Sequence, residues 1–287
     1  MDELTNKGTE KSLIMHFEGA LFNGVGFIVH SNGQLGMEVN FKDGKRDGLT
    51  KSWYEDGQLS SETNWKDDEL DGLYKSWYEN GQLQSEFNFK DGEYDGLAKA
   101  WHSNGQLSSE TNWKDGEFDG LYKSWYENGQ LKYEANYKDG ELDGLQKGWF
   151  EDGQLEKEVN YKDGEQDGLW KEWYENGQLK AEANWKDGEL DGLVKTWHSN
   201  GQLQIEYNSK DGKKDGFYRD WYENGQLEKE VNIKDGKQDG LQKSWYENGQ
   251  LKEEGNWKNG ELDGYKSWDE DGQLQLEANY KDGVLIE

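Results

Sequence analysis

Side chains that could carry out acid–base chemistry are few in this sequence, which contains no Cys. Its four histidines are His16, His30, His102 and His198. The last three stand where otherwise similar stretches carry Tyr, as "HSNGQL" at 102–107 and "YENGQL" at 126–131 show. Catalysis needs an asymmetric set of acid, base and nucleophile, which this sequence does not offer. We therefore expect a protein that is not an enzyme and needs no cofactor, with these histidines replacing Tyr in a packing position.

Acidic residues follow a pattern that could bind a metal. Asp91, Glu93 and Asp95 alternate before a Gly, as carboxylates do at the start of calcium loops. The twelfth residue from Asp91 is His102, where an EF-hand loop carries a bidentate Glu. In three related stretches the middle carboxylate is replaced, by Lys45, Lys213 and Lys237. Because Asp and Gly are also ordinary turn residues, we expect turns here instead of a metal site, with calcium binding as an alternative.

Tryptophans recur every 24 residues and form the first candidate binding surface. They are Trp53, Trp77, Trp101, Trp125, Trp149, Trp173, Trp197, Trp221 and Trp245. If two strands separate consecutive members, their spacing is ~9.6 Å, which suits contact with an extended peptide or a glycan. Rows of exposed aromatic side chains usually mark binding sites. The alternative is that each Trp only packs between its neighbours and stabilises the sheet.

Basic and acidic residues form two further columns. The predicted pairs are Lys75 with Glu86, Lys123 with Glu134, and Lys171 with Glu182. Between the members of each pair lies Asn-Gly, the strongest signal for a two-residue type I′ hairpin turn. Such a turn sets the Lys and Glu opposite each other as structural ion pairs, and it sets Trp77 opposite Gln84 and Tyr78 opposite Leu83. It also places Trp, Lys, Glu and Asn on one face, with Tyr and Leu83 on a second, more apolar face.

The elements that position these columns are repeats. Asp-Gly recurs every 24 residues from Asp47 to Asp263, and Asn23-Gly24 starts one more unit, which makes eleven. Positions in a repeat are counted below from this Asp. Each repeat has two segments rich in β-formers between turns, and there is no Pro. We predict an all-β fold: an elongated single-layer antiparallel meander of hairpins, a ribbon on the order of 100 Å long.

The predicted domain organisation follows from these repeats. Residues 1–22 form a polar N-terminal segment and cap, and residues 23–287 form the array, whose irregular last repeat is the C-terminal cap. Terminal edge strands would allow end-to-end self-association. The N-terminus "MDELTNKGTEKS" lacks a basic start followed by an apolar run, so we expect a cytoplasmic protein.

The net charge of the protein indicates which classes of partner it can bind. The net charge is −28 over 287 residues. Such a surface repels nucleic acid phosphates and anionic membranes and attracts basic proteins. The composition is only 31% hydrophobic but 14% aromatic, which indicates a thin aromatic core and not a disordered chain.

The pattern D-G-L-x-K-x-W-Y-E-N-G-Q-L-x-x-E-x-N-Y-K-D-G at residues 119–140 resembles the variant MORN repeat. Bacterial proteins of that family are often labelled YwqK-like antitoxins. The resemblance covers residues 23–287 and implies a non-enzymatic scaffold for protein–protein interaction. An antitoxin or immunity role toward a basic toxin is a special case of that function. Glycan binding by the Trp column and calcium binding by the turns are the alternatives.

Overall fold

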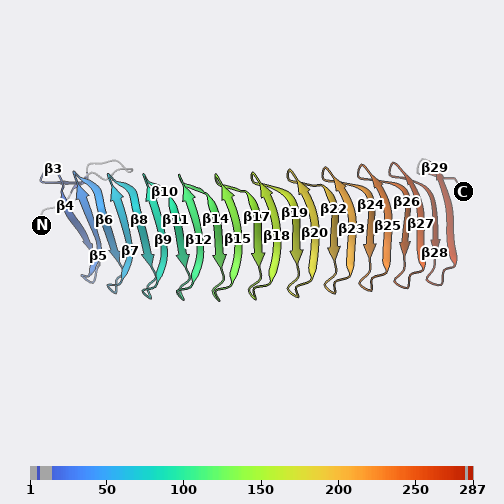
Figure 1. Ribbon diagram of the computed structural model, residues 1–287, viewed down its shortest axis with the longest axis horizontal. Coiled ribbons are helices and arrows are strands. Elements are labelled where there is room, and N and C mark those ends of the chain that lie inside the picture. The colour runs from blue at the N-terminus through green and yellow to red at the C-terminus, as the bar shows by residue number, and fades with distance from the viewer. Residues whose placement is uncertain (1–4, 7–14, 282–283, 287) are drawn as a thin grey trace. The chain divides into compact units, whose positions relative to one another are not determined.

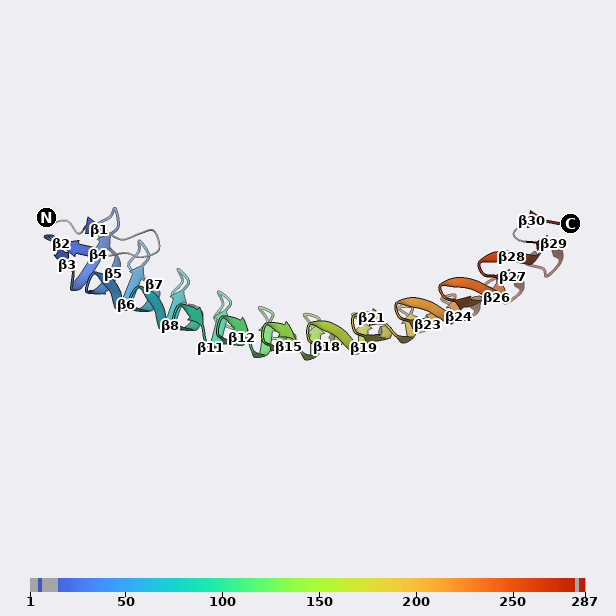
Figure 2. The same ribbon diagram turned by 90° about the horizontal axis from the view of Figure 1, so that it is seen from above.

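The computed structural model describes residues 5–6, 15–281 and 284–286, and the described residues contain strands and no helix. The chain divides into two compact units, Met1–Glu141 and Leu142–Glu287. In each unit the strands lie side by side in chain order (Figure 1), and the edge view shows one layer (Figure 2). Ladder pairs join each long strand to the strands before and after it, as in an open antiparallel meander. The predicted fold class is confirmed.

The first unit begins with a small sheet of β1 (Thr5–Asn6), β2 (Met15–Phe17) and β3 (Ala20–Leu21). Its meander consists of β4 (Gly24–Val29), β5 (Leu35–Lys42), β6 (Lys45–Trp53), β7 (Leu59–Lys66), β8 (Glu69–Trp77), β9 (Leu83–Lys90), β10 (Glu93–Tyr94), β11 (Gly96–Trp101), β12 (Leu107–Lys114), β13 (Glu117–Phe118), β14 (Gly120–Trp125) and β15 (Leu131–Lys138). The short strand β16 (Glu141–Leu142) stands at the division between the units.

The second unit repeats the same plan. Its strands are β17 (Gly144–Trp149), β18 (Leu155–Lys162), β19 (Glu165–Trp173), β20 (Leu179–Lys186), β21 (Glu189–Leu190), β22 (Gly192–Trp197), β23 (Leu203–Lys210), β24 (Lys213–Trp221), β25 (Leu227–Lys234), β26 (Lys237–Trp245), β27 (Leu251–Lys258), β28 (Glu261–Trp268), β29 (Leu274–Lys281) and β30 (Val284–Leu285). In both units the first strand of a repeat ends at Trp, except β4, which ends at Val29, and the second strand runs from Leu to Lys, because the turn residues fall between them.

The turn at Asn80-Gly81 is not the predicted two-residue type I′ turn. The Tyr78 amide donates to the Gln82 carbonyl and the Gly81 amide donates to the Tyr78 carbonyl, both at 2.8 Å. Gly81 has a φ of 82°, whereas Asn80 does not have the positive φ that a type I′ turn requires. This is a three-residue loop, in which a type I turn is followed by a left-handed Gly.

The two-residue turn lies at the other end of the repeat. Asp91 and Gly92 both have positive φ, 48° and 87°, and they connect the directly paired residues Lys90 and Glu93. Positive φ at both central residues defines a type I′ turn. The prediction therefore assigned the tight turn to the wrong end of each hairpin.

A bulge corrects the register that the longer loop would otherwise shift. Trp77 pairs with Leu83, and Gln84 is left as the extra residue, so that Lys75 pairs with Glu86. The predicted Lys–Glu register is thus present, but the predicted pairing of Trp77 with Gln84 is wrong. Because Leu83 lies directly opposite Trp77, it belongs to the Trp face and not to the Tyr face. The same bulge recurs at Trp53, Trp101, Trp125, Trp149, Trp173, Trp197, Trp221, Trp245 and Trp268.

The core is a thin row of small side chains on the face opposite the Trp column. The largest group of its buried members stands at position 17 and consists of Thr63, Thr111, Ala135, Val159, Ala183, Val231 and Ala278. They lie opposite larger side chains at position 4, as Ala135 lies opposite Tyr122 and Val159 opposite Trp170. No large side chain among the described residues is completely buried. Stability therefore comes from contacts between neighbouring strands, summed along the array.

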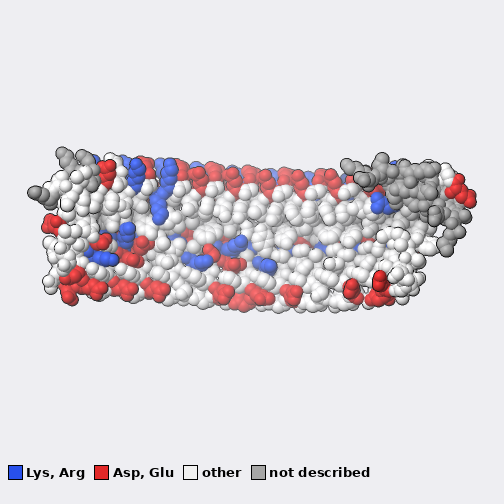
Figure 3. Space-filling view, turned by 180° about the vertical axis from the view of Figure 1, so that it is seen from behind, with Lys and Arg blue, Asp and Glu red and all other residues white. Residues whose placement is uncertain are grey.

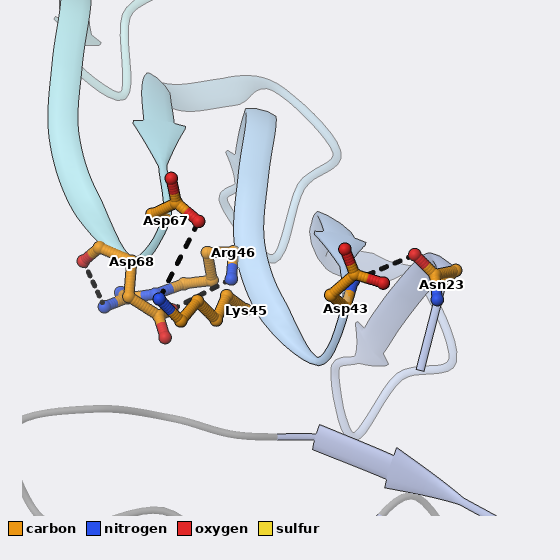
Figure 4. A network of polar contacts seen from close by, with 6 residues as sticks. All are labelled: Asn23, Asp43, Lys45, Arg46, Asp67 and Asp68. Carbon is orange, nitrogen blue, oxygen red and sulfur yellow. Dashed lines mark hydrogen bonds and ion pairs between the residues drawn. The ribbon is translucent and has the colours of Figure 1, made fainter. Parts of the chain in front are cut away.

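One tight turn has Asp68 where the other repeats have Gly, and its φ is 74°. Arg46 holds it in place: the backbone amide and Nε of Arg46 donate to Asp68 Oδ1 at 2.9 and 3.0 Å (Figure 4). The Arg46 guanidinium also lies 3.5 Å from the centre of the Trp65 ring. The Asp68 side chain is almost fully buried by these contacts.

A double-mutant cycle should show that Arg46 compensates for Asp68. In the native chain, Arg46→Gln should lower the free energy of unfolding by ~1–3 kcal/mol, because it leaves a buried carboxylate without its charged partner. In an Asp68→Gly chain the same substitution should cost less than half as much, since Gln166 and Gln238 stand at that position in repeats whose turn has Gly. Urea unfolding followed by Trp fluorescence measures both. Equal losses in the two backgrounds would show that Arg46 acts independently of Asp68.

Candidate functional site

The Lys and Glu columns form a ladder of alternating charge on the Trp face. Lys75 Nζ lies 2.9 Å from Glu86 Oε2, and Lys75 is also paired on its other side with Glu62 of the preceding repeat. The other two predicted pairs are Lys123 with Glu134 at 2.9 Å and Lys171 with Glu182 at 3.3 Å. Because these side chains are about one-third exposed, each pair contributes only ~0.2–1 kcal/mol. Their role is to fix the register.

The nine tryptophans of the predicted binding row are half-buried, one in each repeat. Most of their backbone carbonyls accept a hydrogen bond from position 8 of the preceding repeat, although Phe150 at that position has no donor for the Trp173 carbonyl. Tyr78 Oη donates to the Trp101 carbonyl at 2.8 Å, and His102 Nε2 bonds in the same way to the Trp125 carbonyl at 2.9 Å. His30 and His198 make the same contact, which explains why His replaces Tyr there. The binding role of the Trp row stays a prediction.

The acidic turns do not assemble a metal site. Asp91 lies in the type I′ turn, Glu93 in β10, and the Asp95 amide donates to the Asn88 carbonyl at 3.0 Å. Across the described residues, no group of three or more His, Cys, Asp or Glu side chains is placed to hold a metal ion. The calcium alternative is therefore without geometric support.

A continuous stack of aromatic rings crosses the Tyr face of the first unit. It comes from position 19 and from position 24, the residue before each Asp. Ring centroids are 4.5 Å apart for Phe89 and Tyr94, 4.8 Å for Tyr94 and Trp113, 4.1 Å for Trp113 and Phe118, and 5.2 Å for Phe118 and Tyr137. Three of these spacings lie in the ~4.5–7 Å range of favourable ring pairs and the fourth is slightly shorter, and all are about half the spacing predicted for the Trp row.

Beside the start of this stack lies a groove of about 650 Å³. Its aromatic walls are Trp65, Tyr74, Phe87, Phe89, Tyr94 and Trp101. Small residues line its floor: Ser76 and Ser85, whose hydroxyl oxygens are 2.6 Å apart, and Ala100. Of the nine predicted tryptophans, Trp101 lines the groove. Most of the groove lining thus belongs to the Tyr face, whereas the predicted binding row is the Trp column.

Several of the equivalent positions of the second unit carry charged side chains instead. Lys157, Glu172 and Asp220 stand at positions 6 and 15, and Lys180 Nζ lies 2.7 Å from Glu172 Oε1. Around Asp220, Tyr218 Oη donates to its Oδ1 at 2.7 Å, and Lys214 Nζ lies 4.1 Å from the Tyr218 ring centre. Burial, followed by this hydrogen bond, raises the pKa of Tyr218, and burial lowers the pKa of Lys214. The aromatic groove is a feature of the first unit.

The groove was missed because the repeats were treated as equivalent. Position 24 is aromatic only at Phe22, Tyr94 and Phe118, while later repeats carry Leu142, Gln166 and Leu190 there. A comparison of the variable positions column by column would have identified Tyr94 and Phe118. The structure adds that positions 19 and 24 are directly paired, as Phe89 and Tyr94 are.

The charge ladder gives a testable prediction for the register. Exchanging Lys75 and Glu86 restores attraction within the hairpin, but it places the new carboxylate opposite Glu62 and the new ammonium group opposite Lys99. We therefore expect the double exchange to recover less than half of the stability that the two single substitutions lose, each loss being ~0.2–1 kcal/mol.

The control for this exchange is the last pair of the array. Lys266 and Glu277 are 3.0 Å apart, and in the described residues Glu277 has a basic ladder partner on one side only. Exchanging these two residues should recover a larger share of the loss than the interior exchange does. Full recovery in the interior, measured by urea unfolding, would mean that adjacent repeats do not interact through these charges.

Among the described residues we find no helix that is long and apolar enough to cross a membrane. No curated protein matches the sequence. Similar solved structures include "Crystal Structure of TcdB2-TccC3-Cdc42", with 12% identity, a TM-score of 0.20, and coverage of 94% of this chain and 18% of that one. "Crystal Structure of TcdB2-TccC3" has 12% identity, a TM-score of 0.19, and coverage of 94% and 19%. The chain spans about a fifth of the length of these structures.

The family model for the MORN repeat variant matches the sequence ten times. The matched residues are 46–67, 70–91, 94–115, 118–139, 142–163, 166–187, 190–211, 214–235, 238–259 and 265–282. Each match spans the first and the second strand of one repeat, as the match at 46–67 spans β6 and β7. With the matches running through most of its length, the chain belongs to the MORN repeat variant family.

Proposed function

We propose that the protein is a non-enzymatic scaffold that binds a basic protein partner, and that the groove of the first unit receives an extended segment of that partner. The observation that carries the proposal is the groove itself, with aromatic walls on a floor of small side chains. Membership of a family of repeat scaffolds supports it. An antitoxin that neutralises a basic toxin would be one such scaffold.

The groove supplies the contacts that give affinity. Its volume of about 650 Å³ lies within the ~300–1,000 Å³ typical of ligand sites. Tyr, Trp and Phe side chains in a desolvated pocket are the residues that most often dominate binding energy. The contact between the tilted rings of Phe89 and Tyr94 holds one wall in place before the partner arrives, so little conformational freedom is lost on binding.

Charge supplies the selectivity for a basic partner. The net charge is −28, and Asp and Glu side chains line both edges that carry the turns (Figure 3). The groove between these edges has no charged residue in its lining. Acidic edges speed the encounter with a basic protein, and this attraction weakens when salt screens charges beyond ~8 Å at physiological ionic strength.

A random peptide library displayed on phage, selected against the full chain, tests the proposal. We expect enriched peptides to combine an aromatic or large aliphatic residue with Lys or Arg. Tyr94→Gln together with Phe89→Ile should weaken their binding at least ~10-fold, equivalent to ~1.4 kcal/mol, because one groove wall is lost. Both substitutions introduce residues that other repeats carry at these positions, Gln166 and Ile233, so the fold should be retained, which circular dichroism checks.

The matched control is Leu190→Gln, which makes the same kind of change at position 24 of the second unit and should leave binding unchanged. Association should slow as salt is raised, while dissociation should change little. Enrichment of acidic peptides, or equal binding by the groove variant, would refute the proposal. If the protein instead bound glycans on an array, and the Tyr94 substitution weakened that binding equally, the ligand of the groove would be a carbohydrate and not a protein.

A further inference from the structure

The two end strands of the ladder are of the same kinds as the two strands that pair where one repeat meets the next inside the array. The ladder begins with β4, the first strand of a repeat, and ends with β29, the second strand of the last repeat. Inside the array, the second strand of one repeat pairs with the first strand of the next, as Ser85 pairs with Ala100 and Glu86 with Lys99. A copy of β4 is therefore the kind of strand that β29 would pair with if the array continued.

Both end strands expose apolar side chains at these junction positions. Ile28 at position 6 is 63% exposed and Leu276 at position 15 is 49% exposed, whereas Ser76 and Ser85 at the same positions inside the array are 8% exposed. Phe27, which stands where interior repeats carry Lys or Arg, is 72% exposed.

The end strand β4 lacks the features that normally protect an edge. Terminal repeats usually present a polar outer surface, and edge strands usually carry charges or Pro. The strand β4 reads GVGFIV and contains neither. Leu274 and Leu276 on β29 are both about half exposed. The exposed apolar side chains of β4 and β29 are thus suited to burial against another strand.

Residues Leu285 and Ile286 make the same backbone contacts as the residues that precede the first strand of an interior repeat. Leu285 of β30 pairs with Tyr280, as Tyr94 pairs with Phe89. The Ile286 amide then donates to the Asn279 carbonyl at 3.0 Å, which is the bond that the Asp95 amide makes to the Asn88 carbonyl. In the interior register the next strand starts at position 2, and Gly24 stands at that position in β4.

We propose that the protein associates head to tail with further copies of itself, the β4 strand of one copy adding to the β29 strand of another. The interior register then sets Leu276 opposite Ile28, Glu277 opposite Phe27 and Ala278 opposite Gly26 of the next copy. Two apolar side chains thereby meet where an interior junction has Ser85 and Ala100. Because the two surfaces differ, the contact leaves one free end on each copy and does not close into a dimer.

Sedimentation of the full chain with two edge variants tests this. The wild type should show an average mass that rises with concentration beyond that of a dimer, and more steeply in high salt, because salt screens the repulsion between chains of charge −28. Ile28→Glu blocks one end and Leu276→Glu blocks the other. Each variant alone should remain a monomer of 33.3 kDa, with an unchanged circular dichroism spectrum.

An equal mixture of the two variants should form a dimer containing one of each and nothing larger, since only one pair of intact ends remains. A wild type that stays monomeric at hundreds of micromolar would overturn the proposal. So would a dimer of either variant alone, because that would show that like ends associate. Salt dependence also distinguishes self-association from binding of the basic partner. High salt should strengthen self-association, whereas it should slow association with the basic partner.

Discussion

Hydrogen bonds from the side chains of one repeat to the backbone of the next are the constraint on which the structure depends. Tyr78 Oη bonds to the Trp101 carbonyl at 2.8 Å, and Asn80 Nδ2 donates to the Ser103 carbonyl at 2.8 Å. On the opposite edge, the Gly92 amide donates to the Leu70 carbonyl at 2.9 Å. A single layer has no second sheet to fix its strands, so these bonds at both edges keep successive hairpins aligned. They also favour a fixed period, although the last repeat is one residue shorter and still makes both bonds, from Tyr246 Oη to the Trp268 carbonyl at 3.0 Å and from Asn248 Nδ2 to the Glu270 carbonyl at 3.1 Å.

The strand pattern and the Lys–Glu register could be predicted from the sequence, but the turn type could not. Asn-Gly suits a type I′ turn and equally suits a type I turn followed by a left-handed Gly. The choice depends on Asn80, whose Oδ1 accepts from the Gln82 amide at 3.0 Å while its Nδ2 reaches the next repeat. The bulge at Gln84 then cancels the extra loop residue. Lys75 was correctly placed opposite Glu86 because these two errors compensate.

The groove was not predicted, for a different reason. The prediction assumed that every repeat presents the same surface, and it therefore relied on the positions that do not vary between repeats. The groove arises where columns do vary: Ser76, Ser85 and Ala100 leave space that Glu172 and Lys157 occupy in the second unit. Size is matched locally as well, since a Trp at position 19 follows a small residue at position 17, as Trp257 follows Gly255. The repeated framework fixes the backbone, and the variable side chains on one face give the array its individual surface.

Removing one repeat tests the central claim that register is maintained repeat by repeat. Deletion of residues 191–214 removes 24 residues and joins Leu190 to Asp215 in phase, so both sets of edge bonds can re-form. We expect a folded protein with an unchanged strand spectrum by circular dichroism and a cooperative urea transition. Deletion of residues 191–213, one residue fewer, should lose cooperativity in the second unit, because side chains then change face. Unfolding of the 24-residue deletion, or equal tolerance of both deletions, would contradict the account.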